Sequence, residues 1–331
     1  ALADFKTLSH DVGFQWLIQS GVRYGIEKNA DSFDRTLFAA DILAGRFNPN
    51  GFIRAWNGKG KEGWAIVDCM MNLSLLYWAT RQTGDPRYQL VAMRHADTTM
   101  RNFVRENGSC NHIVCFDPET GAFLDNPGGQ GCQSGSSWSR GQAWALYGFT
   151  ISYLSTKKPE YLETAMKVAD YVVSNVEKAN WLTVCDFQQP AEPVLFDDAG
   201  GAIAASGLLE LSKLVPVEKS AKYFNAGVQM LMAMEREHAD WTEATPAIFQ
   251  KCTSAYHDVP GHHICMNYGD FYLIEAVGKL LGAVVLVAHH VVDVVRTLGS
   301  QRAQKKTVVV GGVQQDVNFG IDDAHIDTFL V

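Results

Sequence analysis

Residues 136–148 read SSWSRGQAWALYG and predict the start of a helix. Ser139 suits the N-cap, because its hydroxyl can accept a hydrogen bond from the first free backbone N–H groups of a helix. Arg140, Gln142 and Trp144 would then leave the first turns, near unpaired N–H donors. A cation, an amide and an indole in this place suit an anionic ligand that carries hydroxyl groups. The alternative is a helix that begins with a surface arginine and two core tryptophans, and this stretch alone does not separate the two interpretations.

The composition is that of a globular protein. The chain has 331 residues, of which 47% are hydrophobic and 19% charged, and this length allows one large domain or two small ones. A net charge of −8 argues against nucleic acid and against an anionic membrane surface as partners. The sequence shows no basic and apolar leader and no uncharged apolar run of membrane-spanning length, so we expect a cytoplasmic protein.

The cysteines give no sign of a metal site or of a disulfide framework. There are seven, scattered along the chain without a Cys-x-x-Cys pair. The neighbouring His289 and His290 are a poor metal signal without further ligands. We therefore expect neither a metal ion nor another cofactor.

Two kinds of helix alternate along the chain. The first kind is rich in small and apolar residues, and five such segments are expected at 13–26, 69–82, 141–154, 199–214 and 271–281. The second kind is amphipathic, with four segments at 32–47, 86–104, 159–176 and 218–234. A helix that is apolar on all sides must be buried, and amphipathic helices can cover it. The alternation predicts an all-α fold, an α/α barrel with an inner ring of helices wrapped by an outer ring.

Three amphipathic segments share a weak repeat in which alanine precedes an aspartate, at Asp41, Asp97 and Asp170. Such a period fits a helical hairpin followed by a loop of variable length. The longer loops run from outer to inner helices and should lie on one face of the barrel, at 48–67, 106–137 and 178–198. Functional sites are usually built on loops of this kind.

Each apolar helix has a polar residue at or near its start, and the five are Asp11, Asp68, Arg140, Asp197 and Asp270. If the inner helices are parallel, these residues converge on one mouth of the barrel. Aspartate is also a favoured N-cap, so capping alone is the competing explanation. Four acids with one arginine, next to loops that contain tryptophan, favour a site that uses carboxylates in catalysis.

Residues 283–331 differ from the rest of the chain. They are rich in valine and lack helical periodicity. We divide the chain into a catalytic barrel domain over residues 1–282 and a C-terminal tail over residues 283–331, whose structure the sequence does not predict.

Several motifs resemble those of the unsaturated glucuronyl hydrolase family of glycoside hydrolases. They occur in the order found in the family, at residues 9–14, 52–56, 64–78, 136–148, 189–211 and 268–272. The sequences SRGQAW and DCMMNL within them are specific, and the resemblance covers about residues 8–281. It implies an (α/α)6 barrel, N-terminally truncated here to about nine recognisable helices. An open ring of this kind would expose apolar surface, which is compatible with a homodimer.

The resemblance also implies a reaction and a set of site residues. Members of the family remove a 4,5-unsaturated uronic acid from the non-reducing end of oligosaccharides that polysaccharide lyases produce. By motif, Asp68 matches the general acid/base of the family and Asp11 its second essential carboxylate. The resemblance places six further residues at the sugar site, namely His10, Trp56, His112, Gln130, Arg140 and Trp144.

The implied chemistry explains why an acid is needed. The substrate is a cyclic enol ether, and its hydrolysis begins by hydration of the C4=C5 double bond. One acid must protonate C4 and then help to deliver water to C5. We therefore expect Asp68 to carry a proton near neutral pH, because it should be buried among apolar residues and face the charge of Asp11.

Two alternatives remain open at this point. The chain can be a non-catalytic carbohydrate-binding or scaffold remnant of the same fold. It can also be an unsaturated rhamnogalacturonyl hydrolase, since those enzymes share the barrel.

Overall fold

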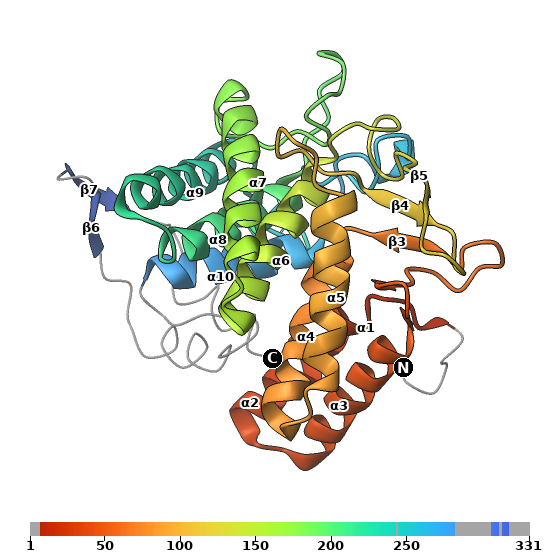
Figure 1. Cartoon of the computed structure of the whole chain (residues 1–331). Helices are drawn as coiled ribbons and strands as arrows, with labels where there is room; N and C mark the ends of the chain where they lie inside the picture. Colours follow the sequence, from red (N-terminus) through yellow and green to blue (C-terminus); the bar gives the residue numbers. More distant parts are fainter. Residues whose placement is uncertain (1–6, 243, 282–305, 311–312, 318–331) are drawn as a thin grey trace.

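The computed structural model describes residues 7–242, 244–281, 306–310 and 313–317. Its main feature is a set of inner helices that alternate along the chain with outer helices (Figure 1). The inner set is α1 (Val12–Trp16), continued by η2 (Leu17–Gly21) and α2 (Val22–Glu27), then α4 (Cys69–Thr83), α6 (Ser139–Thr156), α8 (Asp198–Ser212) and α10 (Asn267–Leu280). The outer set is α3 (Ala30–Gly45), α5 (Arg87–Asn102), α7 (Pro159–Lys178) and α9 (Val217–His238).

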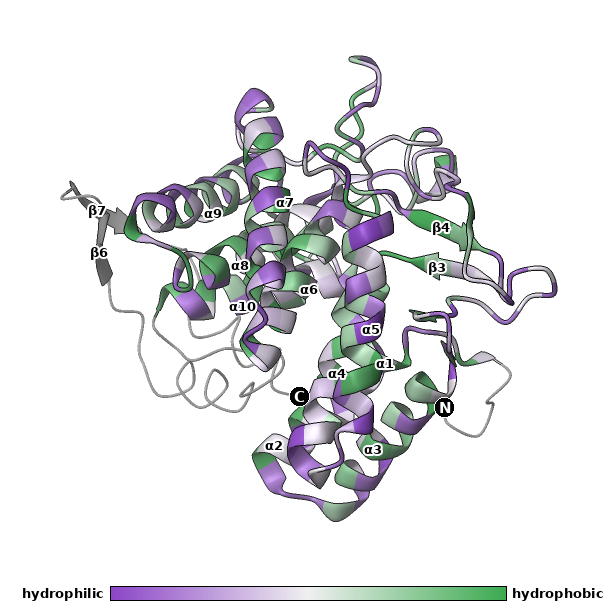
Figure 2. Ribbon diagram, in the orientation of Figure 1, coloured by the Kyte–Doolittle hydropathy of each residue, from purple (hydrophilic) through white to green (hydrophobic). Residues whose placement is uncertain are grey.

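The two sets differ in burial as their composition predicts. Every residue of α8 is buried, as are most residues of α4 and α6, whereas α7 and α9 each bury one face. Figure 2 shows hydrophilic residues in purple along α5, α7 and α9. Removing the apolar inner helices from water drives this arrangement. The nine predicted helical segments are all confirmed within the described residues, with ends no more than four residues from those predicted.

Neighbouring inner helices pack against each other in chain order, from α1 through α4, α6 and α8 to α10. Aromatic rings also connect the first inner helix to the last. Phe14 of α1 stacks on Tyr272 of α10 with ring centroids 6.2 Å apart, and it meets Trp144 of α6 edge to face at 5.9 Å. The N-terminal halves of α1, α6 and α10 therefore meet at one aromatic cluster.

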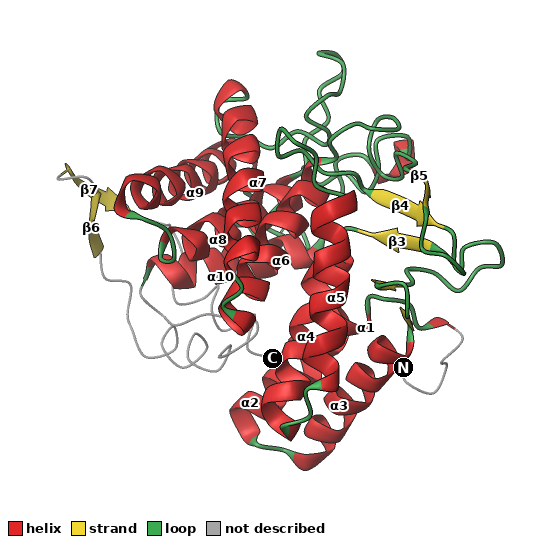
Figure 3. Ribbon diagram, viewed as in Figure 1, coloured by secondary structure: helices red, strands yellow, loops and turns green. Residues whose placement is uncertain are grey.

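Two small antiparallel sheets lie in the long loops, where the sequence analysis predicts no strands. One pairs β1 (Phe47–Asn48) with β2 (Phe52–Ile53), and the other has the order β3 (Trp64–Ile66), β4 (Ile113–Phe116) and β5 (Phe123–Asp125). Figure 3 shows the second sheet and many of the loops on one side of the helices. These strands position residues of the candidate site.

The start of α6 differs from the prediction. Trp138 is the N-cap residue, and the Ser139 hydroxyl donates a hydrogen bond to the Cys185 carbonyl at 3.1 Å instead of capping the helix. The reason is a backbone bridge between Trp138 and Asp186, which brings the loop before α8 against the start of α6. Arg140 is 3% exposed, so a surface arginine is also excluded.

Part of the C-terminal segment is described, and it contains the antiparallel pair β6 (Lys306–Val310) and β7 (Val313–Val317). The predicted domain boundary at residues 282 and 283 and the pair His289 and His290 lie outside the described residues. The domain division and the homodimer stay predictions. In the part of the chain that is described, no helix combines the length and the apolar composition needed to cross a membrane.

The alanine–aspartate repeat has a structural explanation. Each of the three aspartates accepts a hydrogen bond from a tyrosine hydroxyl near the start of the next outer helix, and the pairs are Asp41 with Tyr88 (2.7 Å), Asp97 with Tyr161 (2.8 Å) and Asp170 with Tyr223 (3.0 Å). Each aspartate also pairs with a cation close to that tyrosine, namely Arg87, Lys158 and both Lys219 and Lys222. The repeat therefore fixes each outer helix to its successor. We call this contact the outer-helix latch.

Removal of one latch hydroxyl should destabilise the fold measurably. The Tyr161 side chain is fully buried, and its hydroxyl donates to Asp97 and lies 3.0 Å from the Met93 carbonyl. Tyr161→Phe should lower the free energy of unfolding by about 1–2 kcal/mol, because a hydrogen bond to a charged acceptor is lost. The urea midpoint should fall with an unchanged m value. Tyr272→Phe is the control, since the buried Tyr272 hydroxyl has no partner among the described residues; equal losses in both variants would contradict the latch.

Candidate active site

Asp68 and His112 face each other because of the strand pairing. Asp68 follows β3, His112 precedes β4, and Ile66 lies opposite Ile113 in the register of the two strands. The backbone N–H of Val67 donates to the His112 carbonyl at 3.0 Å. His112 Nε2 consequently lies 3.4 Å from Asp68 Oδ1.

The contacts of His112 Nδ1 indicate which ring nitrogen carries the proton of the neutral ring. His112 Nδ1 lies 2.9 Å from the backbone N of Gln130, which can only donate, and 3.3 Å from the Gly128 carbonyl, which can only accept. The shorter contact favours Nδ1 as an acceptor, and the neutral ring then carries its proton on Nε2. Nε2 and Asp68 Oδ1 are within ion-pair distance but do not form a hydrogen bond, and neither buried atom has a hydrogen-bond partner among the described residues. Since Oδ1 is buried and the Asp68 side chain is 19% exposed, Oδ2 is the oxygen left for a ligand.

Asp11 is also in contact with a histidine, His10. His10 is buried, its Nδ1 lies 3.0 Å from the Ala55 carbonyl, and its Nε2 lies 3.1 Å from Asp11 Oδ1. The carbonyl can only accept, so His10 Nδ1 carries a proton. The Asp11 side chain is 48% exposed. Asp11 and Asp68 are both at N-cap positions, yet neither side chain makes a capping hydrogen bond, so capping does not explain them.

A close approach between α1 and α4 brings the two acids together. A Cβ atom at Gly13 would lie 2.5 Å from the backbone oxygen of Asn72, so only glycine fits at this contact. The Asn72 side chain accepts a hydrogen bond from the Phe14 backbone N–H at 2.6 Å. The starts of both helices, which carry Asp11 and Asp68, are thereby held next to each other.

Asp11 and Asp68 both line one pocket of about 290 Å³. Its lining consists of residues from α1, α4, α6, α10 and the preceding loops, namely Asp11, Phe14, Gln15, Asp68, Met71, Asn72, Gln130, Trp138, Arg140, Trp144 and Tyr268. A cavity of this volume suits a small ligand such as one sugar ring. In the described residues, no group of three or more His, Cys, Asp or Glu side chains could hold a metal ion.

Arg140 is buried and its charge is already paired. Its Nε and Nη2 atoms donate to the two carboxylate oxygens of Asp197 at 2.9 and 2.8 Å, and Nη2 also donates to the Thr253 carbonyl. Its Nη1 donates to the Tyr268 hydroxyl at 2.6 Å. Burial opposes the charge of Arg140, but Asp197 and Tyr268 together outweigh burial and the pKa of the guanidinium is raised. Of the five guanidinium N–H groups, one on Nη1 has no acceptor among the described residues.

Comparison with known proteins now gives the family. Residues 22–193, about half of the chain, match Glycosyl Hydrolase Family 88. An unsaturated glucuronyl hydrolase from Bacillus sp. (strain GL1) is 34% identical over 83% of this chain and 75% of that protein. The chain belongs to Glycosyl Hydrolase Family 88.

Two further relatives show the range of named substrates. An unsaturated chondroitin disaccharide hydrolase from Streptococcus pyogenes serotype M1 is 31% identical, over 82% of this chain and 70% of that protein. The crystal structure of an unsaturated glucuronyl hydrolase specific for heparin has a TM-score of 0.80 at 29% identity, and the match covers 85% of this chain and 77% of that one. The resemblance inferred from the sequence is therefore confirmed, and so is the α/α barrel as the fold class.

The structure of this family 88 chain places the predicted site residues in three groups. Asp11, Asp68, Gln130, Arg140 and Trp144 line the pocket. His10 and His112 do not line it but contact the two acids.

Trp56 forms the third group. It does not line the pocket, and its contact is with His10 and not with one of the two acids. Its ring meets the His10 ring edge to face with centroids 6.3 Å apart. Lys61 Nζ lies 5.1 Å from the centroid of the Trp56 ring. Trp56 therefore supports His10 in this structure.

The expected convergence on one mouth holds for three of the five residues at the inner helix starts. Asp197 is fully buried against Arg140. Asp270 accepts hydrogen bonds from the backbone N–H groups of Ile248 and Phe249 at 2.9 and 3.1 Å, and its burial raises the pKa of the carboxyl. Both acids hold the fold around the pocket and do not reach it.

Sequence reasoning missed several residues that line the pocket, among them Trp138 and Tyr268. Both lie inside motifs that were recognised, at 136–148 and 268–272, but only their neighbours were singled out. The indole N–H groups of Trp138 and Trp144 are buried without an acceptor among the described residues. A buried donor needs an acceptor, so these two N–H groups are available to pocket water or to a ligand.

Proposed function

We propose that this family 88 protein removes a 4,5-unsaturated uronic acid from the non-reducing end of oligosaccharides by acid-catalysed hydration of the C4=C5 enol ether. The observation that carries the proposal is the pair Asp11 and Asp68, which line one sugar-sized pocket and each contact a histidine. The named activities of the family relatives support it.

Asp68 is proposed as the general acid and base. Its Oδ2 gives a proton to C4, and the positive charge that develops at C5 is shared with the ring oxygen. The Asp68 carboxylate then accepts a proton from water as that water bonds to C5, so the acid is regenerated. The hemiketal then opens by breaking the bond from C5 to the ring oxygen, which leaves a ketone at C5 and a hemiacetal at C1. Collapse of that hemiacetal to an aldehyde breaks the glycosidic bond, and the remaining sugar leaves with the glycosidic oxygen as a hydroxyl group.

His112 has a defined part in this sequence. Its Nε2 lies 3.4 Å from Asp68 Oδ1, so a small movement brings the two into a hydrogen bond, and a hydrogen bond to a carboxylate favours the ionised form that exists after proton transfer. Because Gln130 occupies His112 Nδ1, the ring cannot turn its other nitrogen toward Asp68 without losing that bond. His112 is thus proposed to orient Asp68 and to stabilise its charge.

Asp11 is proposed as the second essential carboxylate. It is more exposed than Asp68 and is held by His10 and by the Ser9 hydroxyl, which donates to it at 3.4 Å. In this position it can accept hydrogen bonds from substrate hydroxyl groups or from the water that attacks C5. The tryptophans of the pocket can contact the flat face of the unsaturated ring.

The test is an assay of the purified protein on a panel of unsaturated disaccharides from different polysaccharide lyases. We expect the ultraviolet absorbance of the conjugated double bond to fall on at least one of them. Binding by calorimetry with no fall in absorbance on any would instead support the non-catalytic alternative. A faster reaction on the unsaturated rhamnogalacturonan disaccharide than on all glucuronyl substrates would support the other alternative.

A further inference from the structure

Arg46 ends the first outer helix, and its guanidinium lies between two chain segments that meet beside Asp11. It is the C-cap residue of α3. All three guanidinium nitrogens donate hydrogen bonds, and the acceptors are three backbone carbonyls and one side-chain amide, namely those of Leu8 (3.3 Å), Arg54 (2.9 Å), Ala55 (3.0 Å) and Asn57 (2.7 Å). One side chain thus joins the residues before Asp11 to the loop between β2 and β3.

The Ala55 carbonyl is the direct link between Arg46 and the site. It accepts a hydrogen bond from Arg46 Nη2 at 3.0 Å and lies 3.0 Å from His10 Nδ1, so two side chains meet at one oxygen. The backbone N–H of His10 donates to the same oxygen at 3.3 Å. On the other side of the ring, His10 Nε2 lies 3.1 Å from Asp11 Oδ1. The place of this oxygen therefore sets the place of the ring that contacts Asp11.

The contacts of Arg46 depend on the shape of its guanidinium as well as on its charge. Its four acceptors are neutral and come from two segments of the chain. A planar group with five N–H donors can reach all four, whereas the single ammonium nitrogen of a lysine cannot. Burial lowers the pKa of Arg46, and the charge of Asp11 opposes this lowering, so the two charged groups also attract each other.

We propose that Arg46 is a positioning residue for Asp11, and that it acts through the Ala55 carbonyl and His10. The inference rests on the proposed function, in which Asp11 is the second essential carboxylate. Arg46 does not line the pocket, so it does this without contact to a ligand there. A small displacement of a group that takes part in the reaction lowers the rate strongly, so the loss of this support is measurable in kcat/KM.

Arg105 is a comparable arginine on the Asp68 side of the site and provides the control. It lies just after α5, and its Nη2 donates to the carbonyls of Cys110 and Ser136 at 3.1 and 2.7 Å. These bonds hold the chain next to His112 and the start of α6. Replacing Arg105 by lysine also exchanges a guanidinium for one nitrogen, but it does so in a different part of the site.

The experiment is a double-mutant cycle on a disaccharide that the panel identifies as a substrate. Arg46→Lys keeps the charge and removes the planar group. In His10→Asn the amide nitrogen takes the place of Nδ1 near the Ala55 carbonyl, but no atom takes the place of Nε2 beside Asp11. The two single variants and the double variant are assayed for kcat/KM at a temperature where thermal unfolding shows that all are folded.

We expect Arg46→Lys to lower kcat/KM by about 10-fold or more in the parent protein. In the His10→Asn background the same change should lower it by less than about 3-fold, because the contact through which Arg46 acts is already lost. Arg105→Lys should lower kcat/KM by the same factor in both backgrounds, since its contacts do not involve His10. No effect of Arg46→Lys in the parent protein, or an equal effect in the two backgrounds, would overturn the assignment.

A second measurement needs no turnover. NMR of the ring nitrogens of isotopically labelled histidine distinguishes a protonated Nδ1 from an unprotonated one, and His10→Asn identifies the His10 signals. We expect a proton on His10 Nδ1 in the parent protein, a changed signal in Arg46→Lys and an unchanged one in Arg105→Lys. An unchanged His10 signal in Arg46→Lys would also overturn the assignment. Absence of turnover by the parent protein contradicts only the proposed function, because the NMR comparison still tests the link from Arg46 to His10.

Discussion

Asp68→Asn is expected to reduce kcat by about 10³-fold or more on any unsaturated disaccharide that the protein hydrolyses, since general acid–base catalysis by one group contributes factors of this order. Asparagine cannot give a proton to C4 or take one from water. Its side-chain oxygen can still take the place of Asp68 Oδ1 beside His112 Nε2. The measurement is the initial rate of absorbance loss at saturating substrate.

The Asp68→Asn variant should fold normally, so its loss of kcat can be assigned to the chemical step and not to unfolding. Asp68 makes no capping hydrogen bond to α4, so the amide removes no contact of that kind. Thermal unfolding should match that of the parent protein. Asp34→Asn, an exposed change on α3, is the control for the loss of one negative charge. A variant at position 68 that keeps more than about a tenth of the parent kcat would assign the proton transfer to another group.

The helices could be predicted because each carries its own signal. An apolar composition all round marks α8, and an apolar stripe marks α7, and both signals are local in the sequence. The architecture followed from their alternation. Only the aspartate of the outer-helix latch could be recognised in the sequence. Asp97 belongs to a repeat, whereas its partner Tyr161 lies in the next unit of the chain.

The site was harder to predict where it depends on contacts between distant segments. The contact of Asp68 with His112 depends on β3 and β4, strands of three and four residues that carry no periodicity of their own. Arg140 lines the pocket, but its pairing with Asp197, which lies 57 positions further along the chain, was not predicted. Nothing local distinguishes an arginine that binds a ligand from one that binds a buried carboxylate.

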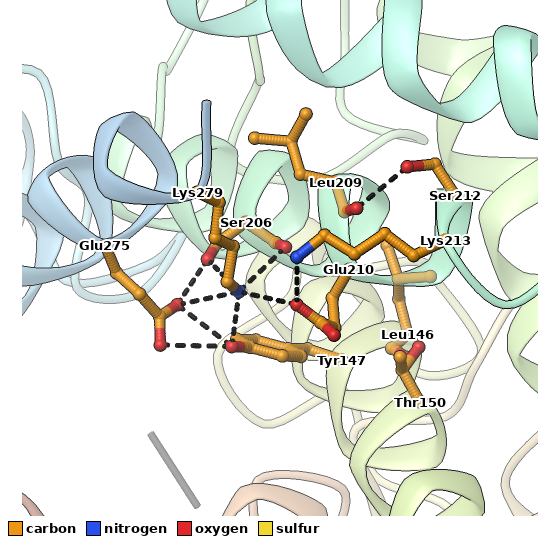
Figure 4. A network of polar contacts seen from close by, with 10 residues as sticks. All are labelled: Leu146, Tyr147, Thr150, Ser206, Leu209, Glu210, Ser212, Lys213, Glu275 and Lys279. Carbon is orange, nitrogen blue, oxygen red and sulfur yellow. Dashed lines mark hydrogen bonds and ion pairs between the residues drawn. The ribbon is translucent and has the colours of Figure 1, made fainter. Parts of the chain in front are cut away.

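Lys279→Met is expected to lower the free energy of unfolding by about 3–5 kcal/mol, the usual result of removing one partner from a buried ionic network. Figure 4 shows the network, which joins α6, α8 and α10. Lys279 is 1% exposed and donates to the Tyr147 hydroxyl at 2.6 Å and to the Ser206 hydroxyl at 2.9 Å. Glu275 lies 3.3 Å from its nitrogen and Glu210 lies 3.9 Å away. Methionine fills a similar volume but leaves two buried carboxylates without this cation.

The comparison that isolates the burial effect is Lys213→Met. Lys213 also pairs with Glu210, at 3.0 Å, but its side chain is 51% exposed, so its loss should cost less than about 1 kcal/mol. Adding Glu275→Gln to Lys279→Met should recover part of the stability, because it removes one of the stranded charges. Lys279 lies roughly 16 Å along α10 from Tyr268, given the rise of a helix per residue, so the kcat of the folded variant should stay at the parent value. Urea unfolding gives the stabilities, and equal losses for the two lysine variants would show that the network contributes no more than a surface ion pair.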